Sequence, residues 1–546
     1  MTEENNEKLE TIRPPDGDAA IIETDYEIGQ HNVERNIWGF EFDLHNPVFL
    51  LSGLMVSAIV AFVLVAPDVS KEFFEWLRPA ITSTFDGFFL SAANVFLIVC
   101  VVLIFTPLAK VRIGGTKAKP DYSYPGWLAM LFAAGMGIGL MFFGVSEPIS
   151  HYETSVAAGA GTAESSAPLA GAAGDEASAR SLAMAATIFH WGLHPWAIYA
   201  IVALALALFS YNKGLPLSIR SIFYPVFGEK VWGWTGHVID ILAVFATLFG
   251  LATSLGLGAS QASAGLNFLF DLPTTDLAQV VLIVVITMFA IASVVAGVDA
   301  GVKRLSEANM ILAIILLGFI IIVGPTMDIV KGYFANMASY FQYLPALSNP
   351  VGRTDTGFSQ GWTSFYWAWW ISWSPFVGMF IARVSRGRTV REFLICVLLI
   401  PSAVSVLWMT ALGDTAIGLV AGGAKEISDA ALELKLFTML SQLPLASITS
   451  FVGIVLVLVF FVTSSDSGSL VIDTITAGGK VEAPVGQRVF WASAEGLVAI
   501  ALLLGGGLEA LQAAAVSTGL PFTIVLLVGT YGLIKGLMDE PRPGKN

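Results

Sequence analysis

Residues 365–388 read FYWAWWISWSPFVGMFIARVSRGR. The first part is apolar and aromatic over about 20 residues, the length that a helix needs to cross the hydrocarbon core of a bilayer. Arginines follow at positions 383, 386, 388 and 391, and such clusters are typical of the cytoplasmic end of a span. The stretch therefore predicts a membrane-spanning helix, and the Trp-Ser-Pro at its centre predicts an interruption of that helix.

The composition of the whole chain agrees with a membrane protein. Of its 546 residues, 55% are hydrophobic and only 13% are charged, against about 25% charged in a typical soluble domain. This balance argues against a soluble enzyme, a nucleic-acid-binding protein and a disordered chain. The apolar runs do not alternate as the strands of a membrane barrel do, so we expect an all-α polytopic membrane protein.

Twelve apolar segments of spanning length can be counted along the chain. They cover residues 47–66, 88–108, 126–145, 183–209, 237–262, 277–297, 307–327, 361–382, 393–420, 446–467, 488–507 and 514–535. An even number places both termini on one side of the membrane. With the N-terminus inside, 15 of the Lys and Arg residues fall in inner loops and 7 in outer loops. This bias predicts cytoplasmic termini and a location in the cell membrane.

The formal net charge of −14 is concentrated at the start of the chain. Residues 1–45 carry 12 acidic and 3 basic side chains and no apolar core, which predicts an acidic tail and no cleavable signal peptide. Cys100 and Cys396 lie in apolar runs, so neither a disulfide framework nor a cysteine metal site is indicated. No nucleic-acid partner is expected of so acidic a chain.

Two of the twelve segments are interrupted in corresponding positions. The third contains Gly135, Gly137 and Gly139, and the eighth contains the run from Trp369 to Pro375. Each opens a block of five spans, and because five is odd the two blocks have opposite orientations. Broken segments at matching positions of inverted halves are the best sequence indicator of the binding site of a secondary transporter. The glycine run alone has a second interpretation, the close packing of helices through small residues.

Aromatic side chains gather in the fourth and eighth segments. They are Trp191, Trp196, Tyr199, Trp369, Trp370 and Trp373. One interpretation is the belt of Trp and Tyr at membrane surfaces, although these residues lie several turns inside their spans. The other is a cage for a quaternary ammonium group, which cannot donate a hydrogen bond and is held by cation–π attraction. No acid is near in the sequence, as a site for a primary amine would require, and both interpretations stay open.

Polar side chains inside the spans carry weaker signals. Thr463 and Ser464 at the end of the tenth segment can complete the oxygen shell of a dehydrated cation, or they can bond back to their own helix. His190 and His194 are four residues apart, but no third metal ligand is apparent. Hydrogen bonding near Pro195 is the simpler interpretation of this pair, and a proton relay is the alternative.

Charged side chains near the spans have mostly simple interpretations. Glu147 and Asp240 are candidate intramembrane acids, and Glu147 is expected at the end of a span, where it meets water. The arginines after the eighth segment serve first as topology signals and second as anchors for anionic lipid. They are Arg383, Arg386, Arg388 and Arg391.

Three runs together resemble the hallmark motifs of one family. They are FAAGMGIGLMF at 132–142 with Glu147-Pro148 after it, FHWGLHPWAIY at 189–199, and the stretch at 365–388. The match extends over nearly the whole chain from about residue 50, and the run in the eighth segment is long and very specific. The sequence is similar to the betaine/carnitine/choline transporter family, and most of all to its sodium-coupled glycine betaine carriers.

This resemblance implies a fold and an assembly. The fold is the LeuT-type five-plus-five inverted repeat of 12 transmembrane helices, of which two precede the repeat. The implied parts are an acidic tail at 1–45, helices 1–2 at 46–119, a first repeat at 120–328, an external amphipathic helix and loop at 329–358, a second repeat at 359–536 and a short C-terminus at 537–546. The external helix, at 331–346, implies a homotrimer. The family consists of transporters, so no enzyme activity is expected.

The resemblance also assigns residues to sites. It implies that the six aromatic side chains bind the substrate together with Met136 and Ser254, beside an unwound stretch around the three glycines. One sodium ion is implied at Ala133, Met136, Phe460, Thr463 and Ser464. The family's second sodium site uses Thr247 and Phe376. Leu251 stands here where a second hydroxyl is expected, one helical turn after Thr247, and a leucine has no oxygen to offer an ion.

Further details narrow the expected activity. Choline carriers of the family tend to have an acid at the position of Gly139, and sodium-independent carnitine exchangers lack the Thr463–Ser464 pair. The family's basic C-terminal tail, which is linked to osmotic activation, is not expected here. We therefore expect sodium-coupled import of glycine betaine by alternating access, with no cofactor other than the coupling ion. The alternatives are a proton-coupled or exchange carrier for betaine, carnitine or ectoine, and a betaine osmosensor that does not transport.

Overall fold

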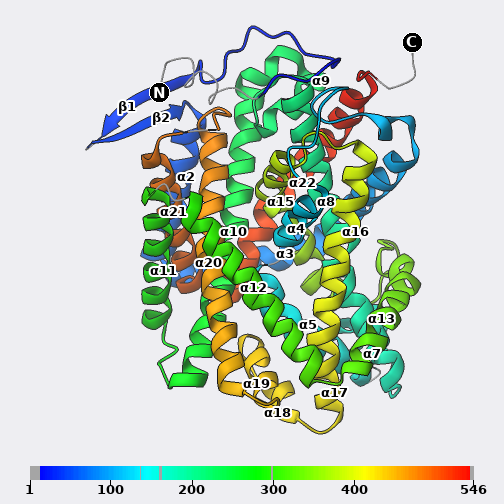
Figure 1. Cartoon of the computed structure of the whole chain (residues 1–546). Helices are drawn as coiled ribbons and strands as arrows, with labels where there is room; N and C mark the ends of the chain where they lie inside the picture. Colours follow the sequence, from blue (N-terminus) through cyan, green and yellow to red (C-terminus); the bar gives the residue numbers. More distant parts are fainter. Residues whose placement is uncertain are drawn as a thin grey trace.

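The fold is a bundle of long helices with a small β-hairpin at one end (Figure 1). The computed structural model describes residues 13–37, 39–135, 137–158, 163–296, 299–481 and 483–541. Within these ranges, ten helices are long and apolar enough to cross a membrane, or eleven when the bent pair α4–α5 is taken as one span. The chain is therefore a helical, multi-pass membrane protein.

The helices and strands occupy most of the described chain. The first half contains β1 (Asn32–Ile37), β2 (Phe40–His45), α2 (Val48–Val65), α3 (Pro67–Phe105), α4 (Tyr124–Gly135), α5 (Ile138–Ala157), α6 (Ala163–Ser166), α7 (Glu176–Trp191), α8 (Leu193–Ala207), α9 (Tyr224–Phe227), α10 (Trp234–Phe270) and α11 (Asp276–Ala296). The second half contains α12 (Asp299–Val323), α13 (Thr326–Leu347), α14 (Thr356–Phe358), α15 (Ser364–Val384), α16 (Val390–Met409), α17 (Thr415–Ala421), α18 (Lys425–Asp429), α19 (Lys435–Ser441), α20 (Ala446–Thr476), α21 (Val485–Leu504) and α22 (Gly507–Met538).

Each predicted apolar segment overlaps one of these helices or an adjoining pair. The segment 361–382 overlaps α15, which is helical over 21 residues but is not among the ten or eleven apolar spans. The number twelve and the inverted repeat therefore stay predictions. The predicted external helix at 331–346 falls within α13, a helix of 22 residues.

The two predicted interruptions turn out differently. Helices α4 and α5 meet at an angle of 61°, and Gly137 between them is extended, with φ −171° and ψ −177°. The predicted break in α15 is wrong, because this helix runs through Pro375. Proline lacks the N–H that would bond the Ile371 carbonyl, and the Ser374 hydroxyl donates to that carbonyl in its place, at 2.7 Å. The helix therefore continues without an unsatisfied carbonyl there.

The interior of the bundle is formed by α8, α10 and α15. Helix α15 packs against α8, α10 and α22, and α10 packs against α20 and α22. In the most apolar stretch of the α7–α8 span, 94% of the residues are buried, and in that of α10 83% are buried. Only 22% is buried in the corresponding stretches of α11 and α12, so these two helices present most of their surface to the surroundings. A site inside the bundle is therefore expected to have parts of α8, α10 and α15 in its wall.

The start of the described chain is packed onto loops at one end of the bundle. Asp16 forms an ion pair with Arg386, with 2.5 Å between Oδ2 and Nη2, and the Tyr26 ring stacks on Trp232 at a centroid distance of 4.2 Å. Burial, helped by a nearby guanidinium, lowers the pKa of His45 in β2 from 6.5 to about 2. This histidine is therefore neutral in the folded protein, and acid conditions oppose its docking.

Both ends of the described chain meet at one loop. The Ile22 N–H donates to the Lys213 carbonyl at 3.0 Å, and the buried Lys213 ammonium lies 2.8 Å from the Glu540 carboxylate. In the same region, Arg220 forms a buried ion pair with Asp240 of α10, and Nε lies 2.5 Å from Oδ2. The predicted intramembrane acid Asp240 is thus part of a structural ion pair.

Candidate functional site

The six predicted aromatic side chains line one cavity inside the bundle, called here the aromatic cavity. Its wall consists of Ala134, Gly137, Ile138, Gly139, Leu140, Trp191, Pro195, Trp196, Tyr199, Ser254, Trp369, Trp370, Trp373, Val377 and Ser405. None of these side chains is charged. The predicted Ser254 is therefore at the same cavity, and Met136 lies outside the described residues.

The rings of the aromatic cavity face one another in defined pairs. Trp369 and Trp370 stack, with centroids 4.8 Å apart and an interplanar angle of 16°. Trp191 stands edge-on to Trp370 at 4.9 Å and 75°, and Trp196 stands edge-on to Tyr199 at 5.3 Å and 77°. Such arrangements present both ring faces and ring edges, and the faces carry the negative part of the aromatic quadrupole. The cavity can therefore attract a cation that needs no hydrogen bond.

The indole N–H groups of the three α15 tryptophans that line the cavity hold the rings in place. Trp373 donates to the Gly250 carbonyl of α10 at 2.9 Å, and Trp369 donates to the Ser254 hydroxyl at 3.2 Å. Trp370 donates to the backbone carbonyl of His190 at 2.8 Å. With these N–H groups bonded to protein, their ring faces remain for contact with a ligand.

The glycines after the α4–α5 bend have different roles. A Cβ at Gly139 would lie 2.7 Å from Cη2 of Trp191 and 3.0 Å from Cη2 of Trp369, whereas one at Gly137 would meet nothing within 4 Å. Gly135 is the last residue of α4. Both interpretations of the run therefore apply: the chain leaves the helix at its start, and rings pack closely against it at Gly139.

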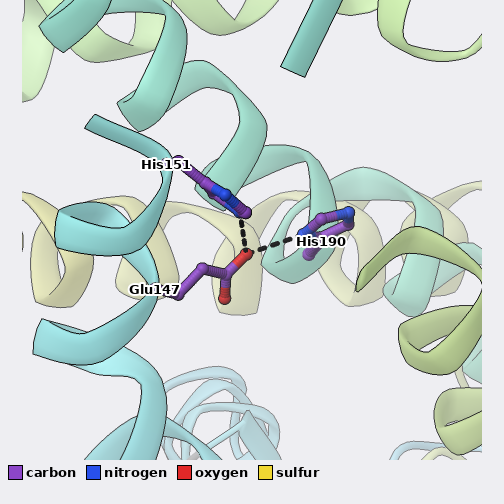
Figure 2. A group of neighbouring side chains, drawn as sticks. All are labelled: Glu147, His151 and His190. Carbon is purple, nitrogen blue, oxygen red and sulfur yellow. Dashed lines mark hydrogen bonds and ion pairs between the residues drawn. The ribbon is translucent and has the colours of Figure 1, made fainter. Parts of the chain in front are cut away.

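The expectation that Glu147 meets water at the end of a span is wrong. Helix α5 continues to Ala157, and the Glu147 side chain is fully buried. One carboxylate oxygen, Oε1, lies 2.6 Å from Nδ1 of His190 and 3.2 Å from Nε2 of His151, as Figure 2 shows. Pro148, which follows the end of the apolar segment, sits inside the helix without ending it.

The other oxygen of Glu147 reaches the wall of the aromatic cavity. The Trp191 indole N–H donates to Oε2 at 2.8 Å, and the Tyr366 hydroxyl donates to it at 2.5 Å. The inference that no acid lies near the cage is therefore wrong, because folding brings a carboxylate from α5 against a tryptophan 44 residues away. His151, one turn after Glu147, was the available signal, and it was missed.

The two histidines of the fourth segment do not share a site. His194 contacts Asn94, with 3.0 Å between Nε2 and Oδ1, whereas His190 belongs to the Glu147 cluster. Ligand atoms of Glu147, His151 and His190 lie within 4.8 Å of one another, a spacing that a metal ion can bridge. The distance of 2.6 Å between Oε1 and Nδ1 of His190 is that of a direct hydrogen bond, however, so we treat the cluster as hydrogen-bonded.

A second pocket lies beside the aromatic cavity and shares Ala134, Trp373 and Val377 with it. Its volume is about 230 Å³. The other lining residues are Ala133, Ser306, Asn309, Met310, Phe376, Phe380, Phe460, Thr463, Ser464 and Ser467. The structure thus brings together all described residues of the predicted first sodium site.

The Thr463 hydroxyl is bonded back to its own helix. It lies 3.0 Å from the Val459 carbonyl and 3.3 Å from the Phe460 carbonyl, which is the alternative that the sequence left open. A hydroxyl that donates to a carbonyl still has lone pairs for a cation, so this bonding is compatible with an ion site.

The second predicted sodium site is not assembled in the same way. Phe376 lines the second pocket, but Thr247 is not part of its wall, and the Thr247 hydroxyl donates to the Ala243 carbonyl at 2.8 Å. Leu251 packs against α20, where a Cβ at Gly468 would lie 2.2 Å from its Cδ1. The leucine therefore fills the space between the two helices.

Two of the four arginines predicted to anchor lipid are buried and form ion pairs within the protein. Arg386 contacts Asp16 and Asp121, with Nη1 3.3 Å from the Asp121 carboxylate, and Arg388 lies 2.9 Å from Glu392. Arg388 also lies over the Trp127 ring, at 4.6 Å from its centroid. Arg383 and Arg391 are exposed, although Arg391 also donates to the Ile104 carbonyl at 3.1 Å. Of the four, these two remain as expected contacts for anionic lipid.

Comparisons with known proteins agree with these observations. The family model described as BCCT, betaine/carnitine/choline family transporter, matches residues 47–542. A glycine betaine/proline/choline transporter of Vibrio parahaemolyticus is 66% identical over 535 residues, which cover 97% of this chain and 97% of that protein. Glycine betaine transporter 1 of the same bacterium is 52% identical over 530 residues, covering 95% and 98%. Among solved structures, a manganese transporter of Eremococcus coleocola aligns with a TM-score of 0.42 and 14% identity over 76% of this chain and 81% of its own.

Proposed function

Because the chain belongs to the betaine/carnitine/choline transporter family, we propose that it imports a quaternary-ammonium compatible solute, most simply glycine betaine, together with sodium. The family and its relatives are transporters and not enzymes. Glycine betaine appears in the names of both Vibrio relatives, and the first of these names adds proline and choline. We propose alternating access around the aromatic cavity as the mechanism.

The aromatic cavity is the observation that supports the proposed class of substrate. A trimethylammonium group is a bulky cation without N–H donors, so a carboxylate partner offers it no hydrogen bond, whereas ring faces attract it from several sides. The cavity wall has no charged side chains, and such faces are supplied by Trp191, Trp369, Trp370 and Trp373. The substrate proposed for this wall is a zwitterion with no net charge, which such a site can bind without a counter-ion.

Sodium coupling is supported by the second pocket. We propose that Thr463 and Ser464 bind sodium with their hydroxyls and that Ala133, Met136 and Phe460 bind it with backbone carbonyls. Hydroxyl and carbonyl oxygens suit a hard cation. Because the second pocket shares Trp373 with the aromatic cavity, occupancy by sodium can favour the ring positions that bind substrate. A single ion per cycle fits best, since Leu251 offers no oxygen near Thr247.

The assembly and topology are part of the proposal. We propose cytoplasmic termini, a cell-membrane location and a homotrimer to which α13 contributes. Both ends of the described chain contact Lys213, which agrees with termini on one side.

The deciding experiment is uptake of radiolabelled glycine betaine into proteoliposomes. We expect accumulation with an inward sodium gradient and little without one. Equal uptake under both conditions contradicts sodium coupling. Uptake driven by a pH gradient without sodium favours the proton-coupled alternative, for which the buried Glu147 cluster is the specific observation. Binding without accumulation favours the osmosensor.

Trp373→Leu tests the aromatic cavity. The substitution removes one ring face and keeps an apolar side chain, so we expect glycine betaine affinity to fall by about 0.5–2 kcal/mol. The measurement is the dissociation constant of the purified protein in saturating sodium. Trp76→Leu is the matched control, because Trp76 is exposed on α3 and does not line the cavity. Equal affinities of the wild type and Trp373→Leu would show that this ring only fills space.

Ser464→Ala tests the sodium site. Losing one of two hydroxyl ligands raises the sodium concentration needed for half-maximal uptake, by roughly tenfold if the ligand contributes about 1.4 kcal/mol. Maximal uptake at saturating sodium changes less. Ser467→Ala is the control, since Ser467 lines the same pocket but is not a proposed ligand. The same shift in both variants argues that the ion binds elsewhere in the pocket.

A further inference from the structure

Glu147 is a buried acid for which the proposed transport cycle has no role. Its side chain is fully buried in α5 and lies behind the wall of the aromatic cavity. Figure 2 shows its carboxylate between His151 of the same helix and His190 of α7. Its second oxygen is bonded to Trp191 and Tyr366, and the first of these lines the cavity.

The hydrogen-bond geometry fits an ionised carboxylate. Oε2 accepts from an indole N–H and from a phenol O–H, and an indole nitrogen can only donate. Oε1 lies within hydrogen-bond distance of two imidazole nitrogens. A protonated carboxyl group would direct its own O–H at one of these groups. Four partners around two oxygens therefore indicate a buried negative charge that is stabilised by charge-assisted hydrogen bonds.

The charge reaches the cavity through Trp191. This indole gives its N–H to Glu147, and its opposite edge, Cη2, lies where it would meet a Cβ at Gly139. Hydrogen bonding of the N–H to an anion makes the ring more electron-rich, which strengthens its attraction for a cation. In a low-dielectric interior the carboxylate itself also attracts a cation across one ring.

A second ring carries the same effect. Tyr366 donates its hydroxyl to Glu147 and stacks on Trp370, with centroids 5.9 Å apart and an interplanar angle of 27°. Trp370 in turn lies edge-on to Trp191. The carboxylate thus orients and polarises Trp191, which lines the cavity, and Tyr366, which stacks on a lining ring.

We propose that Glu147 is a positioning residue that sets the charge preference of the aromatic cavity, so that the affinity for quaternary ammonium ligands depends on their net charge. The inference rests on the proposed function of the cavity. Without the carboxylate, the ring faces alone would attract the ammonium group. With the charge, affinity rises with the net positive charge of the ligand.

The test compares three ligands that share one shape. Choline carries a net positive charge, glycine betaine is zwitterionic, and the neutral isostere of choline has a tert-butyl group in place of trimethylammonium. Dissociation constants are measured with the full-length protein at about pH 8, where imidazoles are ordinarily neutral. Glu147→Gln keeps the size of the side chain and removes the charge. We expect choline to lose about tenfold in affinity, glycine betaine about threefold and the neutral isostere less than twofold.

Two further variants separate charge from packing. Trp191→Phe keeps a ring and the carboxylate but removes the N–H that links them, so we expect it too to weaken choline more than the neutral isostere. If Glu147→Gln does not fold, Trp191→Phe takes its place in the test. Glu495→Gln is the matched control, because this buried acid of α21 bonds Ser465 and contacts no ring of the cavity. It is expected to leave the order of the three ligands unchanged.

The possible outcomes are distinct. An equal loss for all three ligands, or no loss in Glu147→Gln, overturns the inference and leaves the proposed function standing. If the wild type binds glycine betaine but not choline, the inference is overturned and the proposed function still stands. A wild type that binds neither quaternary ammonium ligand overturns the proposed function, and the inference falls with it.

Discussion

Arg220→Met is expected to destabilise the folded protein by about 3–5 kcal/mol, because it leaves the Asp240 carboxylate buried without its cation. The guanidinium and the carboxylate are 2% and 0% exposed, and 2.5 Å separates their nearest atoms. The carboxylate also accepts from the Ser218 hydroxyl at 2.9 Å and from the Arg220 backbone N–H at 3.1 Å. These neutral donors cannot replace the lost charge, so the desolvation cost of Asp240 remains uncompensated.

The measurement is thermal unfolding of the purified protein in detergent. Arg220→Met combined with Asp240→Leu removes both charges and should recover most of the loss, since an apolar pair does not carry the desolvation cost. Arg383→Met, at an exposed arginine, is the control for loss of a surface charge. An unfolding midpoint of Arg220→Met equal to that of the wild type would mean that Asp240 is protonated or hydrated and needs no partner.

Gly139→Val is expected to lower glycine betaine affinity by about 1–3 kcal/mol, or roughly 5- to 150-fold, without preventing folding. The new Cβ would lie 2.7 Å from Trp191 and 3.0 Å from Trp369, both at Cη2 of the ring. The contacted atoms belong to rigid rings, and both indole N–H groups are bonded, so the rings cannot yield without breaking those bonds. The rings must move, and the aromatic cavity changes shape.

The comparison for this prediction is Gly318→Val. Gly318 lies in α12, where a Cβ would meet nothing within 4 Å, so the substitution adds the same side chain without a clash. The readouts are the dissociation constant for glycine betaine and the elution profile of the purified protein, which separates lost binding from lost folding. Wild-type affinity in Gly139→Val would show that the rings tolerate displacement and that the close approach has no role in binding.

The sequence predicted the helical membrane class and most of the spans because the signal for them is local. A run of about 20 apolar residues must be a helix in a bilayer, whatever surrounds it, since only a helix satisfies its own backbone there. The break between α4 and α5 was predicted for the same reason, because glycines weaken a helix wherever they occur. The break in α15 was predicted wrongly, because Ser374 compensates Pro375 through one side-chain hydrogen bond.

What the sequence alone determined is therefore the class of protein, the approximate spans and the set of aromatic residues with which the cavity is lined. Tertiary structure decided how these residues are held. Glu147 and Trp191 are 44 residues apart and meet only because α5 packs against α7, and the fate of a buried charge depends on such distant donors. The length of an apolar run can be seen within one segment, whereas the pairing of buried polar groups is a property of the whole packed bundle.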